Sequence, residues 1–326
     1  MKIENGRFVI TGGASLIGSH VADQLLAGGA SEVVLLDNFS LGTPQAIAHL
    51  EDDPRVRLVR GDILRVSELF DAFEGADGVF AIAGFLTLPL TQNPPLGLAV
   101  NVEGMVNVFE ACRFQAVKKV VFSSSIAAIG EPTAEPITEE THSNFAAFQA
   151  GTKLYASSKL IGEALCQLYS AKHGVHGVAL RYATVYGERQ HYRGVNALYI
   201  IKNYDRIMRG ERPEITGDGR EVHDYVHVSD VARANVMAMA SEVTGEIFNI
   251  GSGVSTDLNH LVAILRDITG TDLEPEYVEG AGAVKSTQGT TLDFRVDKAR
   301  EMLGWVPQVG IEEGMRRLIE WRSQQP

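Results

Sequence analysis

The residues best suited to chemistry are a tyrosine and a lysine four positions apart, Tyr155 and Lys159. On a helix, side chains at this spacing share a face and can reach one site. A free phenol titrates at about pH 10 and is a poor base at neutral pH, but a neighbouring ammonium favours its phenolate. Ser125 ends a predicted buried strand, where its hydroxyl can relay a proton. The three residues predict a base that deprotonates an alcohol while a nicotinamide takes the hydride.

The N-terminal segment predicts the site for that nicotinamide cofactor. A buried strand, 7–11, leads through a glycine-containing turn into an apolar helix, 16–28, and a second strand, 32–37, follows. Glycines let the backbone approach a pyrophosphate, which then binds the free N–H groups of a helix N-terminus. Asp37 follows Gly18 by 19 residues. A carboxylate there binds both ribose hydroxyls and repels a 2′-phosphate, so the sequence predicts NAD rather than NADP.

Short motifs run in order along nearly the whole chain: 11–18 (TGGASLIG), 36–42 (LDNFSLG), 61–63 (GDI), 101–104 (NVEG), 180–187 (LRYATVYG), 217–219 (GDG), 224–232 (DYVHVSDVA) and 303–305 (LGW). Together they resemble the motifs of the extended short-chain dehydrogenase/reductase family, and within it those of the nucleotide-sugar epimerases and dehydratases. The resemblance implies an α/β fold: a Rossmann-type doubly wound parallel sheet that binds NAD, with a smaller, discontinuous α/β domain for the substrate.

The resemblance also implies which residues bind the ligands. The expected catalytic residues are Ser125, Tyr155 and Lys159. The residues expected to bind NAD are Gly12, Ser15, Leu16, Ile17, Gly18, Asp37, Asn38, Ser40, Gly42, Asp62, Ile63, Ala81, Ala83, Gly84, Asn101, Ser123, Tyr155, Lys159, Tyr182 and Val185. The residues expected to contact the substrate are Phe85, Ser125, Ile126, Thr184, Arg189, Arg193, His223 and Lys285. No metal site is expected, because the histidines show no metal-ligand spacing.

The residues after Ser125 narrow the reaction. Related 4,6-dehydratases carry Asp-Glu directly after the relay hydroxyl, and the decarboxylases carry a glutamate nearby. Here the apolar residues 126–128 follow, and these cannot transfer protons. The simplest remaining chemistry is 4-epimerisation of a nucleotide sugar, by resemblance a UDP-sugar, through a transient 4-keto intermediate with Tyr155 as base. A nucleotide-4-keto-sugar reductase, a dehydratase with its acid elsewhere, and a non-catalytic dinucleotide sensor of the same fold stay open as alternatives.

Several positions depart from the family pattern. Ser15 replaces the middle glycine of the turn, where its Cβ crowds the pyrophosphate or its hydroxyl donates to it. His223 occupies the usual arginine position, which makes one diphosphate cation pH-dependent or absent. Arg189 either reaches the diphosphate or belongs to a solvated loop. Segment 142–151 is longer and more apolar than usual, so we expect it to border the sugar pocket and to shift sugar preference.

Composition bounds the class of protein. The chain has 326 residues, a net charge of −12 and no long basic run, which argues against a nucleic-acid surface. Only two cysteines occur, as expected for a reduced, cytoplasmic protein rather than a disulfide scaffold. Residues 1–5 do not resemble a signal peptide. Segment 78–102 is uncharged but contains three prolines, so strand, loop and helix start are expected there rather than a membrane span.

Strands and helices are expected to alternate up to about residue 182, which predicts a parallel sheet covered on both faces. The predicted strands are 7–11, 32–37, 56–60, 77–83, 118–124 and 177–183, and the predicted helices are 16–28, 43–50, 65–73, 95–116 and 152–173. Farther on, helices are predicted at 194–209, 229–241, 256–269 and 311–324, while the apolar segment 246–250 is expected to rejoin the sheet. The predicted domains are therefore 1–185 with 246–253 for NAD, and 186–245 with 254–326 for the nucleotide sugar. By resemblance, helices 95–116 and 152–173 also form a homodimer interface.

Overall fold

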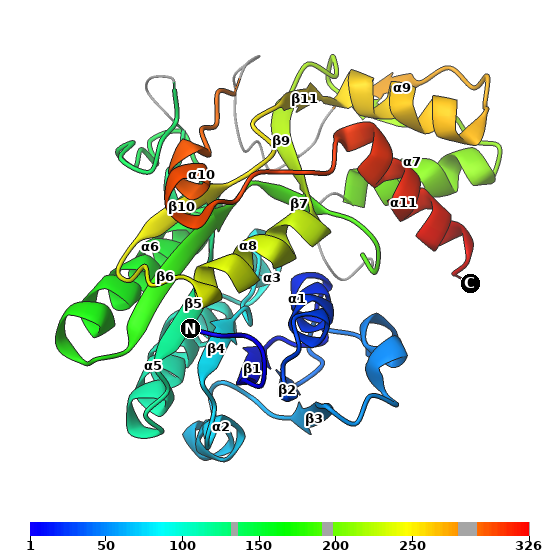
Figure 1. Cartoon of the computed structure of the whole chain (residues 1–326). Helices are drawn as coiled ribbons and strands as arrows, with labels where there is room; N and C mark the ends of the chain where they lie inside the picture. Colours follow the sequence, from blue (N-terminus) through cyan, green and yellow to red (C-terminus); the bar gives the residue numbers. More distant parts are fainter. Residues whose placement is uncertain (132–135, 191–197, 280–291, 326) are drawn as a thin grey trace.

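The computed structural model describes residues 1–131, 136–190, 198–279 and 292–325. Its largest element is a seven-stranded sheet in which all neighbouring strands are parallel, in the order β10-β6-β5-β4-β1-β2-β3 (Figure 1). The strands are β1 (Arg7–Thr11), β2 (Glu32–Asp37), β3 (Val56–Arg60), β4 (Gly78–Ala81), β5 (Lys119–Ser125), β6 (His176–Tyr182) and β10 (Ile247–Ile250). The strand expected at 246–250 thus lies in this sheet, beside β6.

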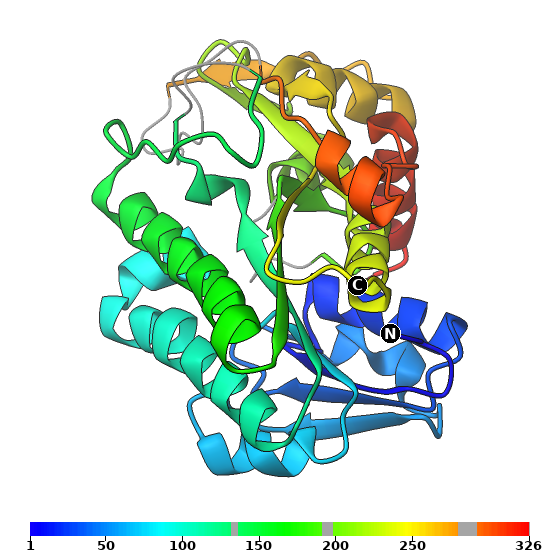
Figure 2. The same cartoon turned by 60° about the vertical axis from the view of Figure 1, so that its left-hand side comes forward.

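Helices cover both faces of this sheet, because the buried strands carry apolar side chains on both sides. In β1, Phe8 and Ile10 pack on one face and Val9 on the other. The first face is covered by α1 (Leu16–Ala27), α8 (Val228–Ala240) and α10 (Asp297–Leu303). The second face is covered by α2 (Val66–Phe73), α5 (Gly104–Phe114) and α6 (Ala150–Lys172), of which α5 and α6 lie side by side in Figure 2. The result is the doubly wound arrangement expected from the sequence.

A second, smaller unit carries its own apolar core at the carboxyl end of the sheet (Figure 1). It contains a three-stranded sheet of β7 (Thr184–Tyr186), β9 (Val222–His227) and β11 (Ser255–Asp257), and a pair of strands, β8 (Glu214–Thr216) and β12 (Glu276–Val278). Its helices are α7 (Leu198–Met208), α9 (Leu258–Thr269) and α11 (Ile311–Ser323). The domain boundaries given above stay a prediction.

The helix expected at 95–116 is present and runs from residue 94 to residue 114, but it is not a regular α-helix throughout. The chain there forms α4 (Pro94–Leu98), a π-helical stretch (Ala99–Glu103) and then α5. Asn101 lies buried in the π-helical stretch, and its amide group bonds the backbone of Phe85, so the widened turn serves a tertiary contact. A further helix, α3 (Thr87–Gln92), was expected as loop because of its prolines.

Smaller differences have local causes. β4 ends at Ala81 rather than at residue 83, because the next two backbone N–H groups donate to Thr11 O. The helix expected from 256 begins at Leu258, where Asp257 caps it by accepting from the His260 N–H at 2.7 Å. The short helix expected at 43–50 is two short 3₁₀ turns. None of these differences moves a strand of the large sheet.

Candidate active site

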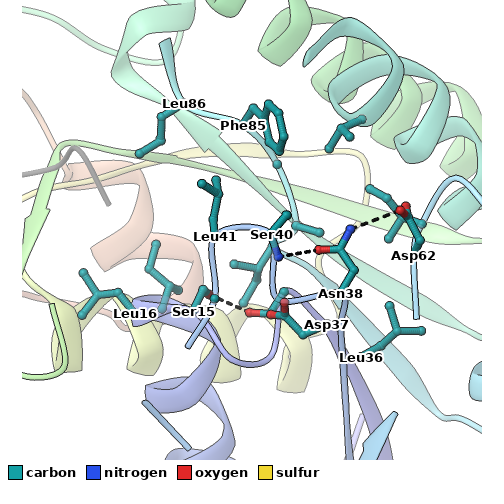
Figure 3. A pocket seen from close by; sticks show the side chains of 18 of the residues that line it. Ser15, Leu16, Leu36, Asp37, Asn38, Ser40, Leu41, Asp62, Phe85 and Leu86 are labelled. Carbon is teal, nitrogen blue, oxygen red and sulfur yellow. Dashed lines mark hydrogen bonds between the residues drawn. The ribbon is translucent and has the colours of Figure 1, made fainter. Parts of the chain in front are cut away.

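A pocket of about 290 Å³ opens at the carboxyl ends of the strands β1, β2 and β4 (Figure 3). Sites in open parallel sheets form at this edge. The predicted residues that line it are Gly12, Ser15, Leu16, Ile17, Asp37, Asn38, Ser40, Gly42, Asp62, Ile63, Ala83, Gly84 and Phe85. The lining residues that we did not predict are Leu36, Leu41, Gly61, Ile82, Leu86, Leu96, Val100 and Gln190. Most of these are apolar residues next in sequence to predicted ones. Their position directly beside a motif is the sequence feature from which they could have been predicted.

The glycine turn before α1 lines this pocket through Gly12 and Ser15. Gly18 packs so closely that an added Cβ would lie 2.2 Å from Gly12 O. Ser15 caps the helix: its hydroxyl donates to Gly12 O at 2.6 Å and accepts from the Gly18 N–H at 3.1 Å. The hydroxyl hydrogen is therefore used within the turn. The next two residues, Leu16 and Ile17, begin the helix, where N–H groups lack intrahelical acceptors and can bind a pyrophosphate.

Asp37 lies at the end of β2, at the floor of the pocket (Figure 3). Its carboxylate accepts from the Ala14 N–H at 2.9 Å and from the Phe39 N–H at 2.8 Å. Each oxygen keeps a further acceptor site, which suits a ribose diol. Burial raises the pKa of Asp37, and the two backbone bonds oppose this effect. Gly42 lets the following loop close on the carboxylate, since an added Cβ would lie 2.8 Å from Asp37 Oδ2.

A short chain of hydrogen bonds holds the pocket wall next to Asp37. Asn38 Nδ2 donates to Asp62 Oδ2 at 3.1 Å, and Asn38 Oδ1 accepts from the Ser40 N–H at 2.9 Å (Figure 3). Asp62 Oδ1 accepts from the Leu64 N–H at 2.9 Å. The ends of β2 and β3 are thereby tied together beside Asp37. Fixed polar groups next to apolar lining residues such as Leu36, Leu41 and Ile63 suit an adenosine moiety, so the residues present fit a dinucleotide.

The structure brings the predicted catalytic residues together at the end of β5 and on α6. Burial raises the pKa of Tyr155 to about 12, and the neighbouring Ser125 hydroxyl opposes this effect. Lys159 Nζ lies 5.6 Å from the centre of the Tyr155 ring and donates to Ser123 O at 2.8 Å. Burial lowers the pKa of Lys159 to about 8, and Glu163 opposes the shift. We expected the Lys159 ammonium to lower the pKa of Tyr155 and so favour the phenolate. In the protein alone, the effect of burial is larger and keeps the phenol protonated.

The pocket and the catalytic lysine adjoin each other. A Cβ added to Gly84, a pocket residue, would lie 3.6 Å from Lys159 Nζ. Asn101 holds this wall: its Oδ1 accepts from the Phe85 N–H at 2.7 Å, and its Nδ2 donates to Phe85 O at 2.9 Å and to Ser158 Oγ at 3.2 Å. A dinucleotide that runs along the pocket toward this wall ends beside the catalytic residues.

Other predicted cofactor residues do not line the pocket. Ser123 Oγ lies 3.1 Å from the Tyr182 hydroxyl, which also bonds the Asn235 side chain, so this pair belongs to a buried network between the sheet and α8. Burial raises the pKa of Tyr182 to about 12. Ala81 and Val185 are buried within their strands. Their predicted roles toward the cofactor remain predictions.

The predicted substrate residues are scattered around the second unit. Arg189 forms an ion pair with Asp23 of α1 and lies outside the pocket lining. His223 Nε2 lies 3.0 Å from Glu221 Oε1. Thr184 begins β7, and Ile126 begins a 3₁₀ turn directly after the relay serine. The other two predicted substrate residues, Arg193 and Lys285, lie outside the described residues.

Among the residues that the structure describes, no group of three or more His, Cys, Asp or Glu side chains could hold a metal ion. Within the same residues, no helix is both long and apolar enough to cross a bilayer.

The chain is similar to known proteins over nearly its whole length. The sequence model of the NAD dependent epimerase/dehydratase family matches residues 8–251. A UDP-glucose 4-epimerase of Mycolicibacterium smegmatis is 32% identical over 321 residues, covering 97% of this chain and 98% of that protein. The crystal structure of UDP-glucose 4-epimerase with UDP-glucose from Thermotoga maritima matches with a TM-score of 0.86 at 31% identity, covering 98% of this chain and 99% of the other. The crystal structure of the Thermus thermophilus UDP-glucose 4-epimerase complex with NAD matches with a TM-score of 0.84 at 29% identity. The match covers 98% of this chain and 100% of the other. The chain belongs to the NAD-dependent epimerase/dehydratase family.

Proposed function

We propose that this protein is an NAD-dependent 4-epimerase of a nucleotide sugar, most simply a UDP-sugar. The observation that carries the proposal is the meeting of Ser125, Tyr155 and Lys159 beside the dinucleotide pocket, with only apolar residues after the relay serine. The similar proteins from M. smegmatis, T. maritima and T. thermophilus bear the name UDP-glucose 4-epimerase, which agrees with this assignment.

The chain's own residues account for the proton transfers. When bound, NAD supplies a hydride acceptor and a positive charge. Tyr155 takes the proton from the sugar O4 and later returns it, and Ser125 bonds both the phenol and the sugar oxygen during the transfer. The protonated Lys159 stabilises negative charge on the phenol oxygen, because its Nζ lies close to that ring. The segment Ile126–Ala128 offers no second acid, so elimination of water has no proton donor there.

Product analysis tests this proposal. Purified protein is incubated with UDP-glucose, UDP-N-acetylglucosamine and UDP-glucuronate in turn, without added reductant, and the products are identified by proton NMR. We expect the 4-epimer of one of these sugars, and we expect Tyr155→Phe to lower its rate at least about 10²-fold, as loss of the acid–base group does. A stable keto product would assign a dehydratase instead. Turnover that requires NADH and a 4-keto sugar would assign a reductase.

We infer that segment 142–151 contributes to sugar preference. It lies against the residues that follow Ser125: Ser143 Oγ donates to Ala128 O at 2.7 Å, and the Asn144 N–H donates to Ile129 O at 2.9 Å. The rings of Phe145 and Phe148 stack with their centres 6.0 Å apart, at an interplanar angle of 21°. An apolar pair in a segment held against the turn that follows the relay serine supports a role at the border of the sugar site.

We further propose a cytoplasmic homodimer. The helix α6 exposes Leu154, Ile161 and Leu168, whose side chains are 38%, 41% and 48% exposed. Their seven-residue spacing puts them on one face, and a repeated apolar stripe of this kind pairs helices. α5 lies beside α6 on the same side of the sheet (Figure 2). Both cysteines, Cys112 and Cys166, are free and buried, which is in keeping with a reducing compartment.

A further inference from the structure

A buried ion pair lies behind the catalytic residues. Glu163 accepts from Arg181 through two parallel bonds of 2.8 Å, Nε to Oε1 and Nη2 to Oε2. The two side chains are only 4% and 6% exposed. Ser124 Oγ donates to the same carboxylate at 2.6 Å. Because withdrawing two charges from water is costly, a buried pair is weak evidence for stability, and a positional role accounts for it better.

The pair fixes α6 against two strands. Ser124 of β5 and Arg181 of β6 are partners across the sheet, so their side chains point to the same face. The helix α6 covers that face and places Glu163 between them. Its neighbour Gly162 packs on Phe122, since an added Cβ would lie 2.2 Å from the ring. The helix therefore cannot slide along β5 without breaking charged hydrogen bonds.

The same face of α6 carries the catalytic side chains. Tyr155, Lys159 and Glu163 follow one another at a spacing of four residues. The tyrosine lies near Ser125, whose hydroxyl affects its pKa, and the lysine donates to Ser123 O at 2.8 Å. We propose that Glu163 is the positioning residue of this site: anchored on two strands, it fixes where the other two side chains meet the end of β5. The structural part of this role is independent of the proposed function, and only its effect on turnover rests on that function.

Glu163 also influences the charge of Lys159. Burial lowers the pKa of Lys159 to about 8, and the carboxylate one helical turn away acts in the opposite direction. The lysine Nζ otherwise faces the Phe122 ring at 5.2 Å, the titratable Tyr155 ring at 5.6 Å and the uncharged loop after β4. Arg181 from β6 pairs with the same carboxylate. Removal of the carboxylate leaves the lysine easier to deprotonate.

The test titrates Lys159 by NMR of selectively ¹³C-labelled lysine, with its signal assigned by its loss in Lys159→Arg. Two variants are compared with the wild type: Glu163→Gln, and Glu163→Leu combined with Arg181→Met, which replaces the pair by apolar side chains and leaves no charge unmatched. Asp230→Asn is the control, because Asp230 is a similarly buried carboxylate that accepts from Arg233 and from two backbone N–H groups of the C-terminal segment.

We expect both Glu163 variants to move the Lys159 midpoint down by about one pH unit, and the control to leave it in place. In turnover with the nucleotide sugar, kcat falls about tenfold or more, its decline at alkaline pH shifts the same way, and KM changes little. If the variant with Glu163→Leu and Arg181→Met folds and keeps both the titration midpoint of Lys159 and kcat, Glu163 does not have the proposed role. A wild type that converts no nucleotide sugar would remove the proposed function, and the NMR midpoint alone would then decide.

Discussion

At the residue scale, the two groups of the catalytic pair are shifted by burial in opposite directions from their usual pKa values. Tyr155 holds its proton more tightly, with a pKa raised to about 12, and Lys159 holds its proton less tightly, with a pKa lowered to about 8. The protein alone thus keeps the phenol neutral. The positive charges of Lys159 and of bound NAD are what can favour the phenolate during turnover.

This arrangement predicts the pH dependence of the reaction. As the pH rises through about 8, Lys159 loses the proton that supports the phenolate, so kcat should fall by about tenfold per pH unit. The measurement is kcat between pH 6 and pH 10 at saturating nucleotide sugar. Lys159→Arg, which stays charged throughout, is the matched variant, and its remaining activity should lack the decline. A wild-type kcat that stays level to pH 10 would contradict the assignment.

A second prediction at this scale concerns Phe145 and Phe148. Replacing both by alanine should change the ratio of kcat/KM values between UDP-glucose and UDP-N-acetylglucosamine by about tenfold, since a lost apolar contact discriminates by roughly 1–3 kcal/mol. The measurement is the pair of kcat/KM values, with the exposed Phe114 replaced by alanine as the control. If the ratio of the two kcat/KM values is the same in the folded wild type and the folded double variant, segment 142–151 does not determine sugar preference.

At the element scale, the close packing of α6 on β5 is the feature that positions the base. Gly162→Ala would place a methyl group 2.2 Å from the Phe122 ring, so either the helix or the ring must move. Overpacking of this kind costs about 1–3 kcal/mol, and we expect a lower melting temperature together with a lower kcat. Phe122→Leu in the same chain makes room and should restore part of both. If the double variant is no better than Gly162→Ala, the contact does not set the helix position.

Most elements of the large sheet could be predicted because their signals are local. The strands 7–11 and 32–37 are short apolar runs, and the turn between them is marked by Gly12 and Gly18, which the close backbone approach requires. These signals depend only on neighbouring residues. The same is true of the pocket floor around Asp37, whose place at the end of its strand was readable from the sequence.

Features that depend on contacts between distant residues could not be predicted from local patterns. The π-helical stretch Ala99–Glu103 accompanies the bonds of Asn101 to the backbone of Phe85. Arg189 was expected near the diphosphate or in a solvated loop, but it pairs with Asp23, 166 positions earlier. The local sequence around Asn101 and Arg189 does not indicate that Phe85 and Asp23 are their partners.

At the scale of the whole molecule, a charged cluster joins α1 of the large sheet to the second unit. Glu188 follows β7, and its Oε2 lies 3.1 Å from His227 Nε2 and 3.9 Å from His20 Nε2. Burial, with a smaller effect of Arg189, lowers the pKa of His20 to about 4. The contact between the two units is therefore sensitive to acid.

The sign of this sensitivity follows from the lowered pKa. Between pH 6.5 and about 4, the unfolded chain binds a proton at His20 that the folded protein does not, so the free energy of unfolding falls as the pH falls. We expect a loss of about 2 kcal/mol between pH 7 and pH 5 from this residue. Urea unfolding at both pH values measures it, and His20→Gln should lose correspondingly less. Equal losses in the two proteins would mean that His20 does not carry the effect.

Assembly is a second property of the whole molecule. If α6 pairs two copies, Leu154→Glu combined with Ile161→Glu should give a monomer by analytical ultracentrifugation, because each exposed leucine or isoleucine contributes apolar area to the interface. Leu58→Glu, a change at a similarly exposed leucine of the edge strand β3, should leave the assembly unchanged. A wild type that sediments as a monomer would contradict the proposed dimer.

In the proposed reaction, C4 of the sugar gives up a hydride and then regains the same hydride. The most direct measurement uses UDP-glucose, or whichever of the three UDP-sugars is converted, labelled with deuterium at C4 and incubated in ordinary water without reductant. An epimerase that works as proposed yields a 4-epimer that keeps the deuterium at C4, because the hydride never exchanges with solvent. Loss of the label to water, or a product that forms only when NADH is supplied, would contradict the account.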